Sequence, residues 1–336
     1  MVGNADKDAP DRKAVDKDHG DASDDLGKAA SQGNADATRC GFIALIGAPN
    51  AGKSTLLNNF VGSKVAIVTH KVQTTRVPLR GIAIEGASQL IFVDTPGIFE
   101  PKRRLDRAMV DSAWGGAGDA DIQVLMVDAM RGIDDEVALI LKGLNKRELK
   151  PAQVLLALNK VDEVAKENLL GLAQRLNEEF KFAETFFISA LKGSGLSELR
   201  EYLAAHVMPG PWLYPEDQIT DAPLRLAAGE ITREKLYLRL HQELPYASTV
   251  ETQDWKELKD GSVRIEQVIY VERQGQRQIV LGKGGRAIKQ ISMEARKEIE
   301  EVLEQKVHLF LFVKVREKWG NDPERYRMIG LDYPKG

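Results

Sequence analysis

The sequence predicts an α/β protein in which a mixed, mostly parallel sheet with helices on both faces is followed by a smaller domain of α-β-β-α-α-β order. Short apolar runs alternate with helical stretches from residue 40 to residue 207, and this alternation is typical of a sheet built from βαβ units. Three prolines within residues 209–215 end the pattern. Helical and strand-like stretches then follow in a different order, which indicates a second domain.

The composition is that of an ordinary globular protein. The 336 residues are 43% apolar and 29% charged, enough for two domains with cores of their own. Residues 1–40 carry nine Asp and six Lys or Arg, which accounts for the whole net charge of −3, so net charge neither favours nor excludes nucleic acid. No apolar run could span a bilayer, and we expect no secretory leader. A single cysteine, Cys40, cannot form an internal disulfide, which suits the cytoplasm.

Residues 1–39 contain almost no large apolar side chains. Such a segment cannot bury enough surface to offset the entropy lost on ordering. We therefore predict a disordered N-terminal tail at 1–39, followed by a first domain at 40–207.

The first domain contains the strands and helices expected of a mixed, mostly parallel sheet. Six apolar runs are predicted strands, at 42–46, 82–84, 90–93, 122–127, 153–158 and 185–188. Five stretches between or after them are predicted helices, at 53–60, 104–113, 134–147, 165–179 and 195–206. Because parallel strands need crossover connections, the helices are expected to cover both faces of the sheet.

Residues 208–221 are the predicted linker, because closely spaced prolines make a stiff, non-helical connector. The second domain, 222–336, should begin with a helix that Asp221 caps and that has Pro223 in its first turn. Apolar residues recur along this helix at helical spacing: Leu224, Ala227, Ala228, Ile231 and Leu238. The elements expected after it are strands at 248–251 (continuing toward Trp255) and 263–271, an apolar step at 278–281, a helix at 286–304 and a strand at 307–315.

The stretch 47–54, G-A-P-N-A-G-K-S, joins the first predicted strand to the first predicted helix. In this context the glycines let successive backbone N–H groups face one anion, and the helix N-terminus adds its dipole. The Lys53 ammonium would lie along the β- and γ-phosphates of a nucleotide, and the Ser54 hydroxyl would reach Mg²⁺. The alternative is a chance glycine-rich turn, which the flanking strand and helix disfavour.

Two further motifs predict contacts to the γ-phosphate and Mg²⁺. In Q-T-T-R at 73–76, a threonine hydroxyl could close over the γ-phosphate, and the residues alone leave open whether Thr74 or Thr75 does so. D-T-P-G at 94–97 follows an apolar strand, which places the Asp94 carboxylate at the end of the strand where Mg²⁺ is held in such sheets. The Gly97 N–H could then meet the γ-phosphate.

N-K-V-D at 159–162 follows another buried strand. The Asp162 carboxylate only accepts hydrogen bonds, so it suits the edge of guanine, whose N1–H and 2-amine are both donors. Adenine lacks that pair, so the motif favours GTP over ATP. S-A-L at 189–191 would complete the base pocket through backbone N–H groups.

In the second domain, G-K-G-G at 282–285 precedes a helix with basic residues, as in a K-homology (KH) module. The glycines let an RNA backbone approach closely, and Lys283, Arg286 and Lys289 can contact its phosphates. A helix N-terminal turn could explain the glycines alone. The α-β-β-α-α-β order around them favours RNA binding.

Together with I-T-D at 219–221, R-E-K at 233–235 and E-L-P-Y at 243–246, these motifs resemble those of the Era-like family of bacterial GTPases. The resemblance extends from about residue 40 to near the C-terminus. It implies a P-loop GTPase domain followed by a type II KH domain. It also implies GTP hydrolysis, and binding near the 3′ end of 16S rRNA during maturation of this RNA and assembly of the 30S ribosomal subunit.

The resemblance also assigns roles to residues. It favours Thr75 over Thr74 as a Mg²⁺ ligand beside Ser54 and Asp94, and it implies catalytic roles for Lys53, Thr75 and Gly97. The nucleotide contacts that it implies are Gly47, Asn50, Ala51, Gly52, Lys53, Ser54, Thr55, Asp94, Asn159, Lys160, Asp162, Ser189, Ala190 and Leu191. The RNA contacts that it implies are Gly282, Lys283, Gly284, Gly285, Arg286 and Lys289.

At two positions the sequence does not show which group assists hydrolysis. Ile98 stands where many GTPases have a glutamine that orients the attacking water, so we expect slow turnover. Asn50 either holds K⁺ against the phosphates or satisfies backbone groups of its own loop. We expect a cytoplasmic monomer that binds GTP and GDP, and peripheral attachment to the inner face of the cell membrane stays open. The rival functions are a passive RNA-binding protein with a vestigial nucleotide site and an ATP-using phosphotransferase.

Overall fold

The computed structural model describes residues 38–71, 74–147, 153–240 and 244–334. Most of the predicted tail lies outside these residues, as do Gln73 and Glu243 of the quoted motifs. Strand β1 (Arg39–Gly47) begins one residue before the predicted start of the first domain. Its first residues are tied to the later linker, since the Cys40 N–H donates to the carbonyl of Met208 at 3.1 Å.

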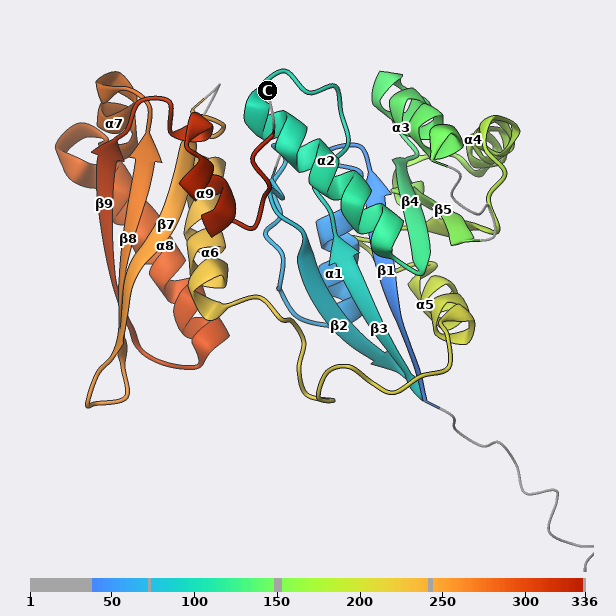
Figure 1. Cartoon of the computed structure of the whole chain (residues 1–336), viewed down its shortest axis with the longest axis horizontal. Coiled ribbons are helices and arrows are strands. Elements are labelled where there is room, and N and C mark those ends of the chain that lie inside the picture. The colour runs from blue at the N-terminus through green and yellow to red at the C-terminus, as the bar shows by residue number, and fades with distance from the viewer. Residues whose placement is uncertain (1–37, 72–73, 148–152, 241–243, 335–336) are drawn as a thin grey trace, which may run out of the picture. The chain divides into compact units, whose positions relative to one another are not determined.

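Six strands form the first sheet in the order β2-β3-β1-β4-β5-β6 (Figure 1). The other five strands are β2 (Leu79–Glu85), β3 (Ser88–Asp94), β4 (Ile122–Asp128), β5 (Val154–Asn159) and β6 (Thr185–Ile188). All neighbours are parallel except β2, which runs antiparallel to β3. The prediction of a mixed, mostly parallel sheet is confirmed.

Helices cover both faces of this sheet, as predicted. They are α1 (Lys53–Val61), α2 (Arg104–Asp119), α3 (Asp135–Lys146), α4 (Lys166–Glu179) and α5 (Leu196–His206). One buried cluster joins the sheet to α2, α3 and α4, and a second joins it to α1 and α5. At the start of α3, the Asp134 carboxylate caps the helix by accepting from the Val137 N–H at 2.9 Å.

Helix α2 is longer than predicted. The prediction ended it at residue 113, before three closely spaced glycines, but the helix continues through them to Asp119. Ala113 and Ala117 are fully buried against the sheet, and a side chain at Gly116 would come 3.5 Å from Thr95. Tertiary packing of small residues therefore outweighs the low helix propensity of glycine here.

The linker contacts β3 and the turn between β2 and β3. Trp212 Nε1 donates to the Ala87 carbonyl at 3.1 Å, and the Tyr214 N–H donates to Gln89 Oε1 at 3.0 Å. The predicted cap by Asp221 is wrong. Its carboxylate pairs with Arg80 at 2.9 Å, and helix α6 (Leu224–Arg239) begins only after Pro223.

The second domain has the predicted α-β-β-α-α-β order. After α6 come β7 (Ser248–Glu257), β8 (Val263–Val271), α7 (Gln274–Leu281), the short 3₁₀ helix η3 (Lys283–Gly285), α8 (Arg286–Leu303) and β9 (Val307–Val315). β8 lies between an antiparallel β7 and a parallel β9, and the predicted apolar step is the end of α7. In α6, Leu224 and Leu238 are 55% and 49% exposed, while Leu236 and Tyr237 are fully buried, so the predicted face is wrong at both ends.

The chain ends with two elements that the sequence analysis did not predict, η4 (Trp319–Asn321) and α9 (Pro323–Met328). Trp319, Tyr326 and Leu331 form a buried cluster with α2. The missed signal is Asp322 before Pro323, a pair typical of a helix start. Within the part of the chain that the structure describes, no helix is both long and apolar enough to cross a membrane.

Candidate functional site

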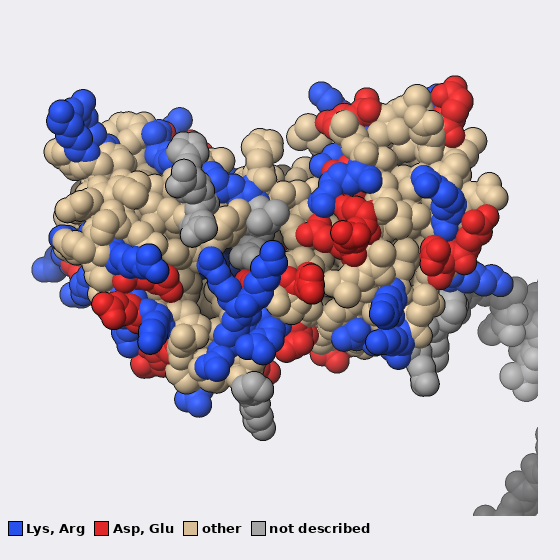
Figure 2. Space-filling view, turned by 90° about the horizontal axis from the view of Figure 1, so that it is seen from above, with Lys and Arg blue, Asp and Glu red and all other residues tan. Residues whose placement is uncertain are grey.

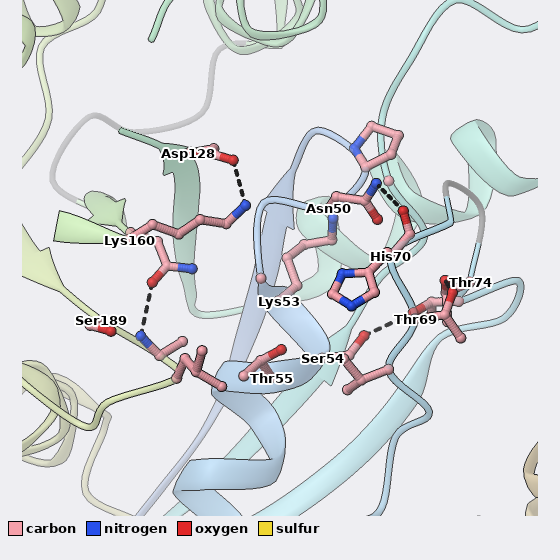
Figure 3. Close-up of a pocket in the computed structure, with 18 of the residues that line it drawn as sticks. Asn50, Lys53, Ser54, Thr55, Thr69, His70, Thr74, Asp128, Lys160 and Ser189 are labelled. Carbon is pink, nitrogen blue, oxygen red and sulfur yellow. Dashed lines mark hydrogen bonds and ion pairs between the residues drawn. The ribbon is translucent and has the colours of Figure 1, made fainter. Parts of the chain in front are cut away.

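Four strands of the first sheet end beside one cleft. Strands β1, β3, β4 and β5 are mutually parallel and end at Gly47, Asp94, Asp128 and Asn159. Because the carboxyl ends of parallel strands meet at one edge, their last residues converge there. The cleft has a volume of about 640 Å³ and is lined by the phosphate loop, the segment before β2 and the loops after β4, β5 and β6 (Figure 3).

The phosphate loop is closed by the side chain of Lys53. Its ammonium donates to the carbonyls of Gly47 and Ala48, both at 3.0 Å, and the residue is buried. Burial lowers the pKa of Lys53 to about 8, although the Asp94 carboxylate opposes the shift. At Gly52, with φ 101°, a side chain would come 2.2 Å from Asn159 Nδ2, so glycine is required. Thr55 lines the cleft together with Pro49, Asn50, Gly52 and Ser54.

Two hydroxyl groups converge on the Asp94 carboxylate. Asp94 Oδ2 accepts from Ser54 Oγ at 2.6 Å and from Thr75 Oγ1 at 3.2 Å, and the two hydroxyl oxygens lie 3.0 Å apart. Asp94 is fully buried, and its Oδ1 has no hydrogen-bond partner among the described residues. Burial raises the pKa of Asp94, and Lys53 opposes that rise.

Thr74 points elsewhere. Its hydroxyl lies 2.6 Å from Thr69 Oγ1 and donates to the Lys71 carbonyl at 2.7 Å. The structure therefore brings Thr75, and not Thr74, to Ser54 and Asp94.

Gly97 lies directly against the phosphate loop, where a side chain would come 2.8 Å from Pro49. The next residue, Ile98, donates its N–H to the Gly47 carbonyl at 3.1 Å and is fully buried in the core. Its side chain cannot orient a water molecule in the cleft.

The N-K-V-D motif has a buried residue at its start and an exposed one at its end. Asn159 is buried and bridges two loops: its Nδ2 donates to the Ala51 carbonyl at 2.8 Å, and its Oδ1 accepts from the Ala190 N–H at 2.9 Å. Asp162 and Leu191 also line the cleft, with exposed side chains. Ser189 is buried and accepts from the Lys192 N–H at 3.1 Å.

The sequence analysis missed several residues that line the cleft, among them Asp128, Arg131 and His70. Asp128 accepts from Lys160 Nζ at 2.5 Å, and it ends a buried strand just as Asp94 does, so the same rule could have found it. His70 offers its carbonyl to Asn50 Nδ2 at 3.1 Å (Figure 3). That bond joins two segments distant in sequence, and no local pattern predicts it.

In the second domain, the glycine-rich turn lies exposed between α7 and α8. Gly282, Gly284 and Gly285 all have positive φ, at 70°, 63° and 76°, which explains why glycine is required there. Lys283 and Arg286 beside it are exposed, as is Lys289, and no acidic side chain of the described residues pairs with any of the three. On the face shown in Figure 2, basic and acidic residues are interspersed.

These features define a P-loop GTPase joined to a KH domain. Residues 42–160 match the family model described as 50S ribosome-binding GTPase, and residues 243–320 match that of the KH domain. The chain is 65% identical over 298 residues to GTPase Era of Rhizobium meliloti (strain 1021), covering 89% of this chain and 94% of that protein. It is 63% identical over 306 residues to GTPase Era of Brucella suis biovar 1, covering 91% and 97%. The chain belongs to the Era family of GTPases.

Two solved structures of this family are similar to the whole fold. One is Era in complex with MgGDPNP and nucleotides 1506–1542 of 16S ribosomal RNA, with TM-score 0.82 and 37% identity. The other is an Aquifex aeolicus Era variant bound to GDP and AlF4⁻, with TM-score 0.81 and 37% identity. Each comparison covers 87% of this chain and 99% of the other.

The lowered pKa of Lys53 predicts that nucleotide binding takes up protons at alkaline pH. With a pKa of about 8, part of the Lys53 amines are neutral above that pH. Phosphate oxygens favour the ammonium form. Binding therefore raises the pKa, and GDP affinity should fall as pH rises above about 8, approaching tenfold per pH unit.

Calorimetric titration with GDP at about pH 8.5, in two buffers of different ionisation enthalpy, measures this uptake directly. Lys53→Arg is the control, because its guanidinium stays charged throughout. The prediction is wrong if wild-type protein and Lys53→Arg take up the same number of protons.

Proposed function

We propose that this chain is a GTP-hydrolysing switch that binds 16S rRNA near its 3′ end and assists assembly of the 30S subunit and maturation of this RNA. The observation that carries the proposal is the convergence of five separate sequence motifs on one cleft. Lys53, Ser54 and Thr75 line the cleft, and so does Asp162, whose side chain is exposed. We propose a cytoplasmic monomer.

Ser54, Thr75 and Asp94 would hold Mg²⁺. Two hydroxyls and a carboxylate within hydrogen-bond distance of one another are hard oxygen ligands of the kind that Mg²⁺ prefers. The unpartnered Oδ1 of Asp94 supports the fit, because a buried carboxylate oxygen needs a compensating partner. The cation would neutralise negative charge on the β- and γ-phosphates.

The chain's own groups supply the remaining steps. The Lys53 ammonium would leave the loop carbonyls for the β- and γ-phosphates, and the Thr75 hydroxyl and the Gly97 N–H would contact the γ-phosphate. Because Ile98 is buried, no side chain at that position helps the attacking water. Slow intrinsic turnover follows.

The RNA contacts would lie at residues 282–289. Three glycines with positive φ keep side chains away from an approaching backbone, and three exposed cations flank them. The solved Era complex contains nucleotides 1506–1542 of 16S rRNA, and its similarity to this chain supports the same class of partner.

The rival functions predict different binding data. A passive RNA-binding protein would not need Lys53, Ser54 and Asp94 to converge, and an ATP-using enzyme would not need Asp162. Filter binding of labelled GTP and ATP, with and without 16S rRNA, tests the three. The proposal expects GTP and RNA to bind and ATP to fail. Absence of GTP binding would leave only the passive RNA-binding function.

Replacing Asp162 with Asn should reverse base selectivity. The change turns one acceptor into a donor, so guanine loses a partner while xanthine, with a carbonyl at position 2, gains one. GTP affinity should fall by ~1–3 kcal/mol, or about 5- to 150-fold, and XTP affinity should rise. Competition binding measures both. Full GTP affinity without any gain for XTP would show that Asp162 does not recognise the base.

We further propose that the Asn50 oxygen helps to hold K⁺ against the phosphates, where its charge would stabilise the transition state. The observed bond to His70 engages the amide nitrogen, not the oxygen that a cation requires. Hydrolysis should be faster in KCl than in NaCl at equal ionic strength, and Asn50→Ala should abolish the difference. Equal rates in both salts, or stimulation that survives Asn50→Ala, would favour a purely structural role.

Gly285→Asp should abolish rRNA binding while GTP affinity stays unchanged. At φ 76° the new side chain is strained, and its charge repels phosphate. Gly285→Asn, of the same shape without the charge, is the matched control and should lose less affinity. Lys283→Ala should weaken binding mildly and lower the salt slope by about one. RNA binding that survives in Gly285→Asp would remove this loop from the interface.

A further inference from the structure

Helix α6 carries R-E-K at 233–235, which takes no part in the nucleotide and RNA contacts proposed for this chain. Arg233 and Glu234 are 1% and 2% exposed. Charged side chains are rarely buried to this degree unless specific partners hold them. Their partners lie in the segment between α1 and β2, which contains Thr75.

Arg233 holds the residue immediately before Thr75. Its guanidinium donates to the Thr74 carbonyl. Glu230 accepts from its Nε at 2.8 Å, and the ring of Tyr237 lies 5.1 Å from the guanidinium carbon. These contacts fix the orientation of the guanidinium, so the second domain holds the Thr74 carbonyl in place.

Glu234 holds the earlier part of the same segment. Its carboxylate accepts from the Val68 backbone N–H at 2.9 Å and from Lys64 Nζ at 2.6 Å. Burial alone would raise the pKa of Glu234, but the hydrogen bonds from Lys64 and Val68 help to outweigh it and lower the pKa. The carboxylate is therefore ionised at neutral pH.

Contacts with this part of α6 also lie on the far side of Thr75, where the Arg76 guanidinium donates to Tyr237 Oη at 2.8 Å. Between Val61 and Leu79, none of the described residues belongs to a helix or strand, so no ladder of backbone hydrogen bonds fixes the segment. The position of the Thr75 hydroxyl therefore depends on side-chain contacts, many of them from α6.

We propose that Arg233 and Glu234 are positioning residues for GTP hydrolysis. They hold Lys64, Val68 and the Thr74 carbonyl so that the Thr75 hydroxyl lies beside Ser54 and Asp94. The inference rests on the proposed role of Thr75 at Mg²⁺ and the γ-phosphate. Neither α6 side chain lines the cleft. Both act by ordering the hydroxyl in advance, which lowers the entropy lost in reaching the transition state.

The test compares Arg233→Gln and Glu234→Gln with Arg239→Gln in the full-length protein. Arg239 lies on the same helix but pairs with Glu294 at an exposed site. Both test variants should slow single-turnover hydrolysis about 10- to 100-fold and raise the Mg²⁺ concentration that gives half the maximal rate. GDP affinity should stay unchanged, because GDP lacks the γ-phosphate. Arg239→Gln should hydrolyse GTP at the wild-type rate.

A double-mutant cycle with Thr75→Ala separates positioning from a general loss of stability. If α6 acts through Thr75, Glu234→Gln should slow hydrolysis no further once Thr75 is replaced. Additive losses, or wild-type rates in both α6 variants, would overturn the inference. Normal hydrolysis in Thr75→Ala alone would instead refute the proposed role of Thr75, which is a distinguishable result.

A second variant tests the same contact in case Glu234→Gln does not fold. Lys64 has a 40% exposed side chain, so Lys64→Met removes the same hydrogen bond from the solvent side with little effect on the core. It should also slow hydrolysis with GDP affinity unchanged. A wild-type rate in Lys64→Met, combined with loss of GDP binding in Glu234→Gln, would assign Glu234 to stability alone.

Discussion

The site depends on compensating one fully buried carboxylate, Asp94. An ionised group removed from water is costly unless neighbours replace its solvation. Here Ser54 and Thr75 donate hydrogen bonds to it, and the Lys53 ammonium favours its charged form. These groups come from the phosphate loop and from the segment before β2. Even so, burial raises the pKa of Asp94, and this one carboxyl group is contacted by side chains from two other parts of the chain.

The segment before β2 is contacted by helices of both domains. Asn58 of α1 holds its beginning through the backbone of Val65 and Ala66, and α6 of the second domain holds much of the rest. The proline-rich linker lies between the strands of the first sheet and those of the second along the chain. Contacts from α6, on the far side of that linker, nevertheless reach the segment that lines the cleft.

The sequence predicted those features that depend on neighbouring residues in the chain. The bounds of β6, β8 and β9 are as predicted, because apolar runs between turn residues define them, and the motifs at the strand ends converge because parallel strands share an edge. Local rules could also have found Asp128 and α9, but two other features depend on distant partners. Asp221 pairs with Arg80 instead of capping a helix, and Arg233 reaches Thr74 across 159 positions of sequence. No local rule predicts such contacts.

Ion pairs connect α6 with α8, the helix that follows the glycine-rich turn. Lys64 lies 2.6 Å from both Glu234 and Glu298, and Lys235 pairs with the same two carboxylates. Glu298 belongs to α8, which begins directly after Gly285. If Lys64 were displaced, the carboxylates of Glu234 and Glu298 would share the single ammonium group of Lys235. A rearrangement around Thr75 that moves Lys64 would therefore weaken the attraction between α6 and α8. Coupling between two binding sites is reciprocal. If an RNA that shifts α8 changes the affinity for a nucleotide, the nucleotide changes the affinity for that RNA by the same factor.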